Sequence, residues 1–154
     1  MTECGMRNAE WQYERRSAID PPLQFRIPHS ALRIRVSMTE LPYRVAKPWG
    51  HELIWARTDR YVGKILHIEP GHVLSLQYHN KKDESIYVLA GEIILRLQRD
   101  GALIERRMAQ GAAFHIEPKL IHQFEAVTAA DLLEASTPEL DDVVRLKDRY
   151  GRVP

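Results

Sequence analysis

The chain has 154 residues, of which 44% are hydrophobic, and this size and composition are typical of one domain around one buried core. Its 22 basic and 21 acidic residues leave a formal net charge of +1, which excludes a broad field that would attract nucleic acid or an acidic membrane surface. The longest apolar stretch, residues 86–95, contains Glu92 and has about half the length of a membrane-spanning helix, so we expect a cytoplasmic protein with no nucleic-acid or membrane partner.

Residues 1–37 differ in composition from the rest of the chain. They contain arginine but no lysine, prolines interrupt any regular period, and no apolar run is long enough for a signal peptide. We interpret this segment as a disordered or arm-like N-terminal extension and residues 38–154 as a single domain. Two alternatives stay open: translation begins at Met38, or the alternating residues between Phe25 and Val36 form an arm that adds a strand to a second subunit.

From about residue 61 the chain becomes a series of short runs rich in Val, Ile, Leu and aromatic residues, separated by Gly, Pro or charged turns. Eight runs at this spacing predict an all-β fold, a small antiparallel β-barrel or jelly roll. Near the C-terminus, Glu139, Asp141 and Asp142 are placed as in the first turn of a short helix within residues 139–149, where negative charge is favoured. The predicted strands are 61–69, 73–80, 85–90, 92–99, 103–108, 112–117, 121–127 and 131–136.

One group of polar residues carries the candidate chemistry. Gln77 and His79 are two apart in a predicted strand and therefore face the same side, and a short polar hairpin turn returns Glu84 beside them. His122, near the start of a later strand, is the fourth candidate inward group. With one cysteine in the chain, the ligands must be nitrogen or oxygen, and this set suits Zn²⁺, Mn²⁺, Fe²⁺ or Co²⁺. The sequence therefore predicts one divalent metal ion held by these four residues.

The same positions resemble the first motif of the cupin family, which spaces a glycine, two histidines, a glutamate and a second glycine. Gly71, Gln77, His79, Glu84 and Gly91 fit this motif position by position, with glutamine in place of the first histidine. The resemblance implies a cupin, which is a jelly roll, and so agrees with the fold class predicted from the strand pattern.

The second cupin motif is matched more loosely. Gly111 and His122 keep its full spacing, but its proline is one residue late, at Pro118, and its second glycine is replaced by Lys119. The match still supports His122 as the fourth ligand.

Glutamine at the first ligand position, within residues 74–79, resembles the type II phosphomannose isomerase domain. Further blocks are similar to that family: residues 47–50 match its Arg-Pro-Trp-Gly segment, and residues 59–71 align without gaps. Residues 141–145 and 148–152 match its Asp-Asp-Ile-Val-Arg and Asp-Arg-Tyr-Gly-Arg signatures. The chain departs from the family around Glu84 and at Glu125, and these departures concern the substrate more than the metal.

The resemblance implies a mannose-6-phosphate isomerase-like enzyme that interconverts phosphorylated aldose and ketose sugars by metal-assisted proton transfer. A positioned group would move the proton between C1 and C2, while the metal polarises the carbonyl. We name Lys64, Tyr87 and His115 as candidate catalytic residues, and Lys47 and Arg145 as candidates for the substrate phosphate, since a guanidinium binds phosphate bidentately.

Two other classes of function stay open: a non-catalytic cupin that binds a sugar or another small ligand, and an iron- or manganese-dependent oxygenase. A phosphate-binding cation that points into the barrel beside the metal would favour the isomerase. A wholly apolar pocket wall would favour the oxygenase, and a sealed or metal-free barrel would favour the binding module. We expect a small-molecule substrate, and a homodimer, because barrels of this kind often leave a sheet edge that a second subunit covers.

Overall fold

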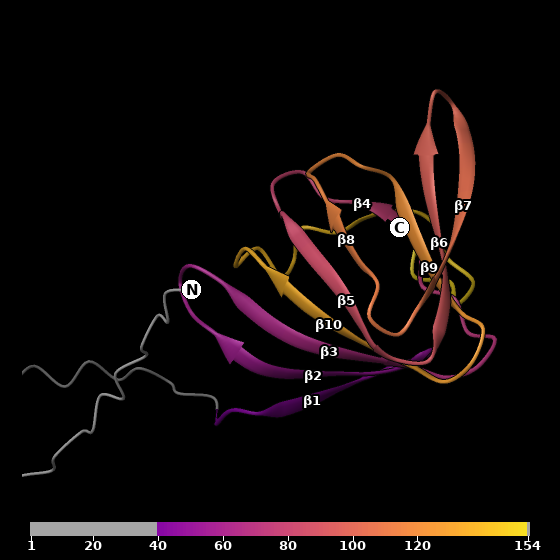
Figure 1. The fold of residues 1–154 in the computed structure, drawn as a ribbon. Helices are drawn as coiled ribbons and strands as arrows, with labels where there is room; N and C mark the ends of the chain where they lie inside the picture. Colours follow the sequence, from indigo (N-terminus) through magenta and orange to yellow (C-terminus); the bar gives the residue numbers. More distant parts are fainter. Residues whose placement is uncertain (1–39, 154) are drawn as a thin grey trace, which may run out of the picture. The chain divides into compact units, whose positions relative to one another are not determined.

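The computed structural model describes residues 40–153, which form eleven β-strands (Figure 1). The predicted extension 1–37 lies outside the described residues. No helix among the described residues could cross a membrane. The strands are β1 (Tyr43–Lys47), β2 (Gly50–Arg57), β3 (Val62–Ile68), β4 (Leu76–Tyr78), β5 (Glu84–Ala90), β6 (Glu92–Arg99), β7 (Ala102–Ala109), β8 (Ala113–Ile116), β9 (His122–Ala126), β10 (Ala130–Ser136) and β11 (Val144–Lys147).

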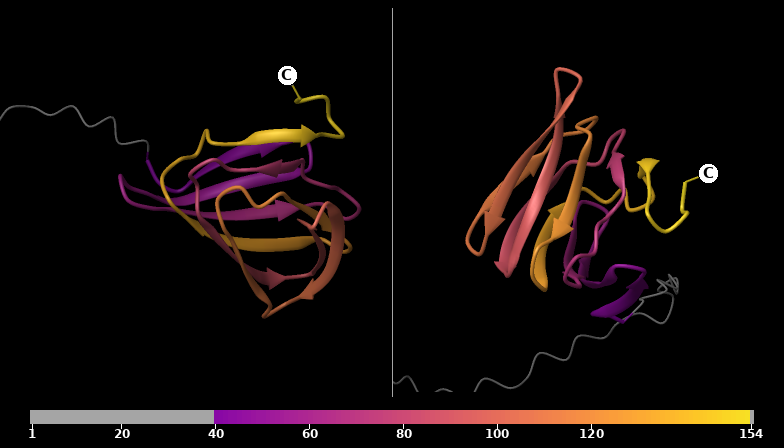
Figure 2. Two further views of the ribbon diagram at one scale, coloured as in Figure 1. Left: turned by 90° about the horizontal axis from the view of Figure 1, so that it is seen from above. Right: turned by 90° about the vertical axis from the view of Figure 1, so that its right-hand side faces the viewer.

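The strands form two antiparallel sheets, which confirms the predicted all-β jelly roll. The larger sheet has the order β1-β2-β3-β10-β5-β8 and the smaller the order β11-β4-β9-β6-β7 (Figures 1 and 2). Neighbouring strands in each sheet therefore come from distant parts of the chain, and β10 lies between β3 and β5. This topology is what brings the polar residues after β4, at the start of β5 and at the start of β9 to one place.

Alternation along the strands decides which side chains enter the core. In β3, for example, Val62, Leu66 and Ile68 are buried, while Ile65 and His67 on the opposite face are partly exposed. The core between the sheets contains mainly branched aliphatic side chains, with Trp49, Met108 and Phe124. At the sharp turn between β5 and β6, Gly91 has a φ of 79°, and a Cβ atom there would lie 2.1 Å from a backbone oxygen, so only glycine fits.

All eight predicted strands are present, with ends that differ from the predicted ones by a few residues at most. Three further strands, β1, β2 and β11, were not predicted. The predicted helix in residues 139–149 is wrong, because the structure has a turn followed by strand β11 there. In a helix, the carboxylate of Asp142 would accept hydrogen bonds from N–H groups of the first turn; here it accepts them from the backbone of residues 80–82. Val144 and Arg145 pair with β4.

Candidate metal centre and cavity

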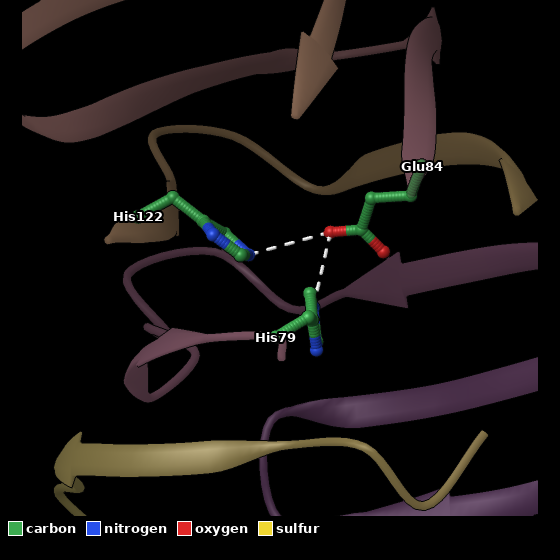
Figure 3. Close-up of side chains that lie close together, drawn as sticks. All are labelled: His79, Glu84 and His122. Carbon is green, nitrogen blue, oxygen red and sulfur yellow. Dashed lines mark ion pairs between the residues drawn. The ribbon is translucent and has the colours of Figure 1, made fainter. Parts of the chain in front are cut away.

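Two histidines and a glutamate from three separate elements meet inside the barrel. His79 directly follows β4, Glu84 begins β5, and His122 begins β9 (Figure 3). One carboxylate oxygen of Glu84, Oε1, lies 3.4 Å from Nε2 of His79 and 3.3 Å from Nε2 of His122. All three side chains are buried, and one ligand atom from each lies within 4.8 Å of the others. The residues that the sequence spacing places on one face are thus brought together.

Backbone contacts fix which nitrogen of each imidazole faces this point. Nδ1 of His79 donates to the backbone carbonyl of Asp142, and Nδ1 of His122 donates to that of Leu120 at 2.9 Å. Each Nε2 is therefore left with a lone pair, and neither has a hydrogen-bond partner among the described residues although both are buried. Histidine ligands of metals typically donate their other ring nitrogen to a carbonyl in this way.

The carboxyl group of Glu84 is ionised in this environment. Burial raises its pKa, but His122, His79 and the neighbouring Lys82 oppose burial, and the resulting pKa lies well below the ordinary value. The part of this lowering that comes from the two histidines requires a positive charge between each Nε2 and the carboxylate oxygen, and with Nδ1 of each ring held by a carbonyl a bound cation can supply that charge. The donor set therefore fits a divalent metal ion of the borderline class.

The fourth predicted ligand, Gln77, lies beside this group on β4. Gln77 stands directly opposite His122 where β4 pairs with β9, and its side chain lines the adjoining cavity. Its carboxamide oxygen accepts a hydrogen bond of 2.7 Å from the hydroxyl of Ser75. Coordination by Gln77 stays a prediction, since the oxygen has a protein partner here.

A cavity of about 350 Å³ opens next to the three residues. Its volume is in the range of small-molecule sites. Trp49, Ile54, Leu66, Leu74 and Phe124 form an apolar part of its wall. Eight charged side chains also line it: Lys47, Glu52, Lys82, Glu84, Glu134, Asp141, Arg145 and Arg152.

A chain of buried charges runs from the cavity wall into the larger sheet. Nζ of Lys82 contacts a carboxylate oxygen of Glu84 and lies 2.7 Å from Oε1 of Glu134, and that same oxygen lies 3.2 Å from Nζ of Lys64. All four side chains are at most 7% exposed. Burial lowers the pKa of Lys82, but Glu134 and Glu84 raise it by more, so the ammonium stays charged. Two cations and two anions therefore alternate from the cavity wall into the larger sheet.

Sequence reasoning missed Lys82, the cation nearest to the candidate metal ligands. The residue belongs to a polar turn of the type that usually faces solvent, yet its side chain is only 3% exposed. Its spacing of two from Glu84 was the available signal, because that spacing puts both residues on the inward face at the start of β5.

Apart from Lys64, the other predicted site residues fall into two groups. Lys47 and Arg145 line the cavity; Lys47 pairs with Glu52 at 3.3 Å, whereas Nε of Arg145 is buried and has no hydrogen-bond partner among residues 40–153. Tyr87 and His115 do not line the cavity. Tyr87 is 42% exposed on the outward face of β5, and His115 pairs with Asp83 at the surface.

Lys64 occupies a third kind of position. Its side chain points inward from β3, but its ammonium group pairs with Glu134, and Lys64 does not line the cavity. A catalytic role for Lys64, Tyr87 or His115 stays a prediction, and the placement of all three outside the cavity shifts attention to Lys82.

Asp142 connects the C-terminal segment to the ligand-bearing turn. Its carboxylate accepts hydrogen bonds from the backbone N–H groups of Asn80, Lys81 and Lys82 at 3.0, 2.6 and 2.9 Å. Its backbone carbonyl accepts a hydrogen bond from Nδ1 of His79. These backbone donors, those of Lys82 and Lys81 above all, hold the pKa of Asp142 well below its ordinary value. One residue therefore orients both His79 and the turn that leads to Glu84.

Asp142→Asn is expected to weaken metal binding without unfolding the protein. An amide offers one acceptor oxygen in place of two, so the turn at residues 80–82 loses hydrogen bonds and His79 loses part of its orientation. Loss of such supporting contacts typically lowers metal affinity by about 10–100-fold. Competition titration against a metal indicator gives the affinity, and hydrogen exchange should show faster exchange at residues 80–82. Asp59→Asn, on an exposed carboxylate that does not line the cavity, is the matched control; equal affinity of both variants would contradict this role.

The fold and this site define a class of protein: a jelly roll with a buried two-histidine, one-carboxylate site of metal-binding type at the floor of a charged cavity. A family model described as Cupin domain matches residues 64–135, which contain all three ligand positions. The chain belongs to the cupins, and its sequence resembles the type II phosphomannose isomerase domain.

Curated relatives of the chain are described as mannose-1-phosphate guanylyltransferases. The Escherichia coli K12 enzyme is 34% identical over 114 residues, which cover 71% of this chain and 23% of the relative. The Salmonella typhimurium enzyme ManC is 32% identical over 114 residues, with the same coverage. The chain thus spans about a quarter of the length of these relatives.

Solved structures with the same fold have lower sequence identity. KdgF from Halomonas sp. has a TM-score of 0.56 at 22% identity, covering 65% of this chain and 89% of that one. Oxalate decarboxylase from Bacillus subtilis has a TM-score of 0.62 at 15% identity, covering 73% and 32%. These similarities establish the jelly-roll fold.

Proposed function

We propose that the protein is a metal-dependent sugar-phosphate isomerase, acting on mannose 6-phosphate or a closely related phosphorylated aldose. The observation that carries the proposal is a cavity beside the buried His79, Glu84 and His122 whose wall contains several cations. A wholly apolar wall would favour an oxygenase, and a sealed barrel would favour a binding module. The cavity, which is open and partly charged, fits these two alternatives less well. The sequence resemblance to the type II phosphomannose isomerase domain points the same way.

His79, Glu84 and His122 would hold the metal ion, with Gln77 as a fourth ligand. When bound, the ion would supply a Lewis acid that polarises the substrate carbonyl. The four nitrogen and oxygen donors suit Zn²⁺, Mn²⁺, Fe²⁺ or Co²⁺. A structure of the oxalate decarboxylase that shares the fold is described with Mn(II) centres, which makes Mn²⁺ a metal to test early.

Lys82 would stabilise the negative charge that develops on a substrate oxygen during enolisation. Its ammonium is buried at the cavity wall and is kept charged by Glu134 and Glu84. A fixed cation in a water-poor site stabilises a developing charge more than the same cation in water. Lys82 therefore takes the place of Lys64, Tyr87 and His115 as the first residue to examine.

Arg145 would bind the substrate phosphate. Arg145 lines the cavity, and its Nε is buried without a partner among the described residues, so a donor is left for an anionic ligand. A guanidinium can bind a phosphate through two parallel hydrogen bonds. Lys47, which shares the wall and pairs with Glu52, adds a second positive charge.

The proposal is tested by metal analysis of the purified protein, followed by an assay of mannose 6-phosphate conversion to fructose 6-phosphate with and without chelator. We expect near-stoichiometric metal and turnover that chelator abolishes and added metal restores. Metal at full occupancy without turnover would remove this substrate and favour a binding role.

Arg145→Ala then tests the phosphate contact. We expect a rise in KM of roughly 10- to 100-fold, in the range for loss of a charged hydrogen bond of about 1.5–3 kcal/mol, with unchanged metal content. Arg145→Lys should recover part of the loss, and Arg106→Ala, an exposed arginine on β7 away from the cavity, is the control. An unchanged KM for Arg145→Ala would contradict the assignment.

A further inference from the structure

A groove of about 480 Å³ lies on the outward face of the smaller sheet, which turns its other face to the candidate metal ligands. Alternation along the strands separates this outer groove from the cavity inside the barrel. In β4, Gln77 lines the cavity, whereas the preceding Leu76 lines the groove. In β9, His122 is buried at the candidate metal site, and the following Gln123 lines the groove. The outer groove is therefore a second concave site, on the back of the same strands.

A row of outward side chains from all five strands runs along the outer groove. The row consists of Lys147 on β11, Leu76 on β4, Gln123 on β9, Arg96 on β6 and Glu105 on β7. With neighbouring strands about 4.8 Å apart, the row is roughly 19 Å long. Val73, Leu76 and Leu103 give the groove an apolar lining. Its length and lining suit an elongated small molecule with an apolar body.

Positive charge in the outer groove is concentrated at its β11 end. Arg96, towards the other end, contacts two carboxylates at 2.7 and 2.6 Å, so its charge is balanced. Lys147 and Arg149 are exposed, and within residues 40–153 neither has a carboxylate at ion-pair distance. The guanidinium of Arg149 donates a hydrogen bond of 3.3 Å to the carbonyl of Gly71, which orients the guanidinium without balancing its charge.

The carboxylate between these two cations in the sequence is engaged elsewhere. The side chain of Asp148 is 0% exposed and does not line the outer groove. Its carboxylate accepts hydrogen bonds from the guanidinium of Arg152 and from the backbone N–H groups of Tyr150 and Arg152. Lys147 and Arg149 therefore present two positive charges to the groove, two residues apart.

We propose that the outer groove binds a phosphate monoester with an apolar body, at a site separate from the candidate metal centre. A phosphate monoester carries about two negative charges at neutral pH, which matches Lys147 and Arg149, and a guanidinium can bind its oxygens through paired hydrogen bonds. Leu76, about 5 Å from Lys147 across one strand spacing, then contacts the apolar body, which extends towards Leu103. The apolar body distinguishes this ligand from the sugar phosphate proposed for the cavity inside the barrel.

Calorimetric titration of the full chain with 2-naphthyl phosphate tests the site. Inorganic phosphate and 2-naphthol, each of which carries one half of the probe, are titrated in parallel. We expect saturable binding of 2-naphthyl phosphate, at least about tenfold tighter than that of either half, because the charge contact and burial of the rings add to each other. Equal affinity for 2-naphthyl phosphate and inorganic phosphate, or no saturable binding of the probe, would overturn the proposal.

Variants then locate the bound probe. Lys147→Gln and Arg149→Gln should each weaken binding by about tenfold or more, since each removes a charged hydrogen bond, and circular dichroism checks that these exposed substitutions leave the fold intact. Arg60→Gln, on an exposed arginine between β2 and β3, is the matched control and should bind as the wild type does.

Arg145→Ala separates the outer groove from the cavity inside the barrel, because Arg145 lines the cavity and not the groove. Binding of 2-naphthyl phosphate should be unchanged in this variant. Binding that is lost in Arg145→Ala but kept in both Lys147→Gln and Arg149→Gln would place the probe in the cavity and overturn the proposal. None of these measurements depends on turnover, so their outcome is independent of the isomerase assay.

Discussion

Glu84→Gln is expected to remove most of the bound metal while leaving the jelly roll folded. The carboxylate is the only anionic group among the candidate ligands, and one of its oxygens faces the Nε2 atoms of His79 and His122. A neutral amide there removes the charge attraction to a divalent cation. Even the loss of groups that only orient ligands costs about 10–100-fold in affinity, so the loss here should be at least as large.

The measurement is elemental analysis after dialysis, together with thermal unfolding in the presence of chelator. His122→Ala should lose metal in the same way, because its Nε2 is the second nitrogen donor. Glu125→Gln is the matched control. Glu125 lies on β9, as His122 does, but its carboxylate pairs with Arg96 at 2.6 Å outside the site. If Glu84→Gln and His122→Ala both keep full occupancy, the three residues do not form the metal site.

The fold and the convergence of His79, Glu84 and His122 could be predicted from the sequence because both depend on local rules. Period-two alternation and turn residues determine strands, and motif spacing puts the three polar groups on inward faces. Of the strands that were missed, β11 depends on tertiary pairing, whereas β1 and β2 pair locally across residues 48–49. β11 is extended because Val144 and Arg145 pair with β4, a partner more than 60 residues away, while the acidic residues before it gave a helix-like local pattern.

Lys119 shows how the structure explains a departure from the family motif. The second cupin motif has glycine at this position, and Lys119 adopts a φ of 73°, the left-handed region that glycine favours. Its backbone N–H donates to the carbonyl of His79 at 2.7 Å, so the turn before His122 is tied to the other histidine. The backbone conformation that the motif requires is kept, at a strain cost of about 1–3 kcal/mol for a residue with a Cβ atom.

The charged wall could not be predicted, because nothing in the spacing of Lys64, Lys82 and Glu134 reveals that their side chains meet.

Glu134→Leu is expected to destabilise the protein by about 3–5 kcal/mol, because both lysines would lose a carboxylate while remaining buried. Glu84 would then be the one anion left in the chain of buried charges. Chemical denaturation in excess chelator, and again with saturating metal, measures the loss in each state.

The double variant Lys64→Met with Glu134→Leu should be more stable than Glu134→Leu alone. The double variant removes one cation together with the anion, so Lys82 and Glu84 remain as a balanced pair. Replacing a buried ion pair by apolar side chains often leaves the free energy of unfolding unchanged. Glu105→Gln breaks an exposed pair with Arg96 and should cost no more than about 1 kcal/mol. A loss for Glu134→Leu as small as that of Glu105→Gln would mean that the buried charges do not stabilise one another. A loss recovered in the double variant would show that charge balance, more than any single contact, keeps Lys82 in place beside the candidate metal ligands.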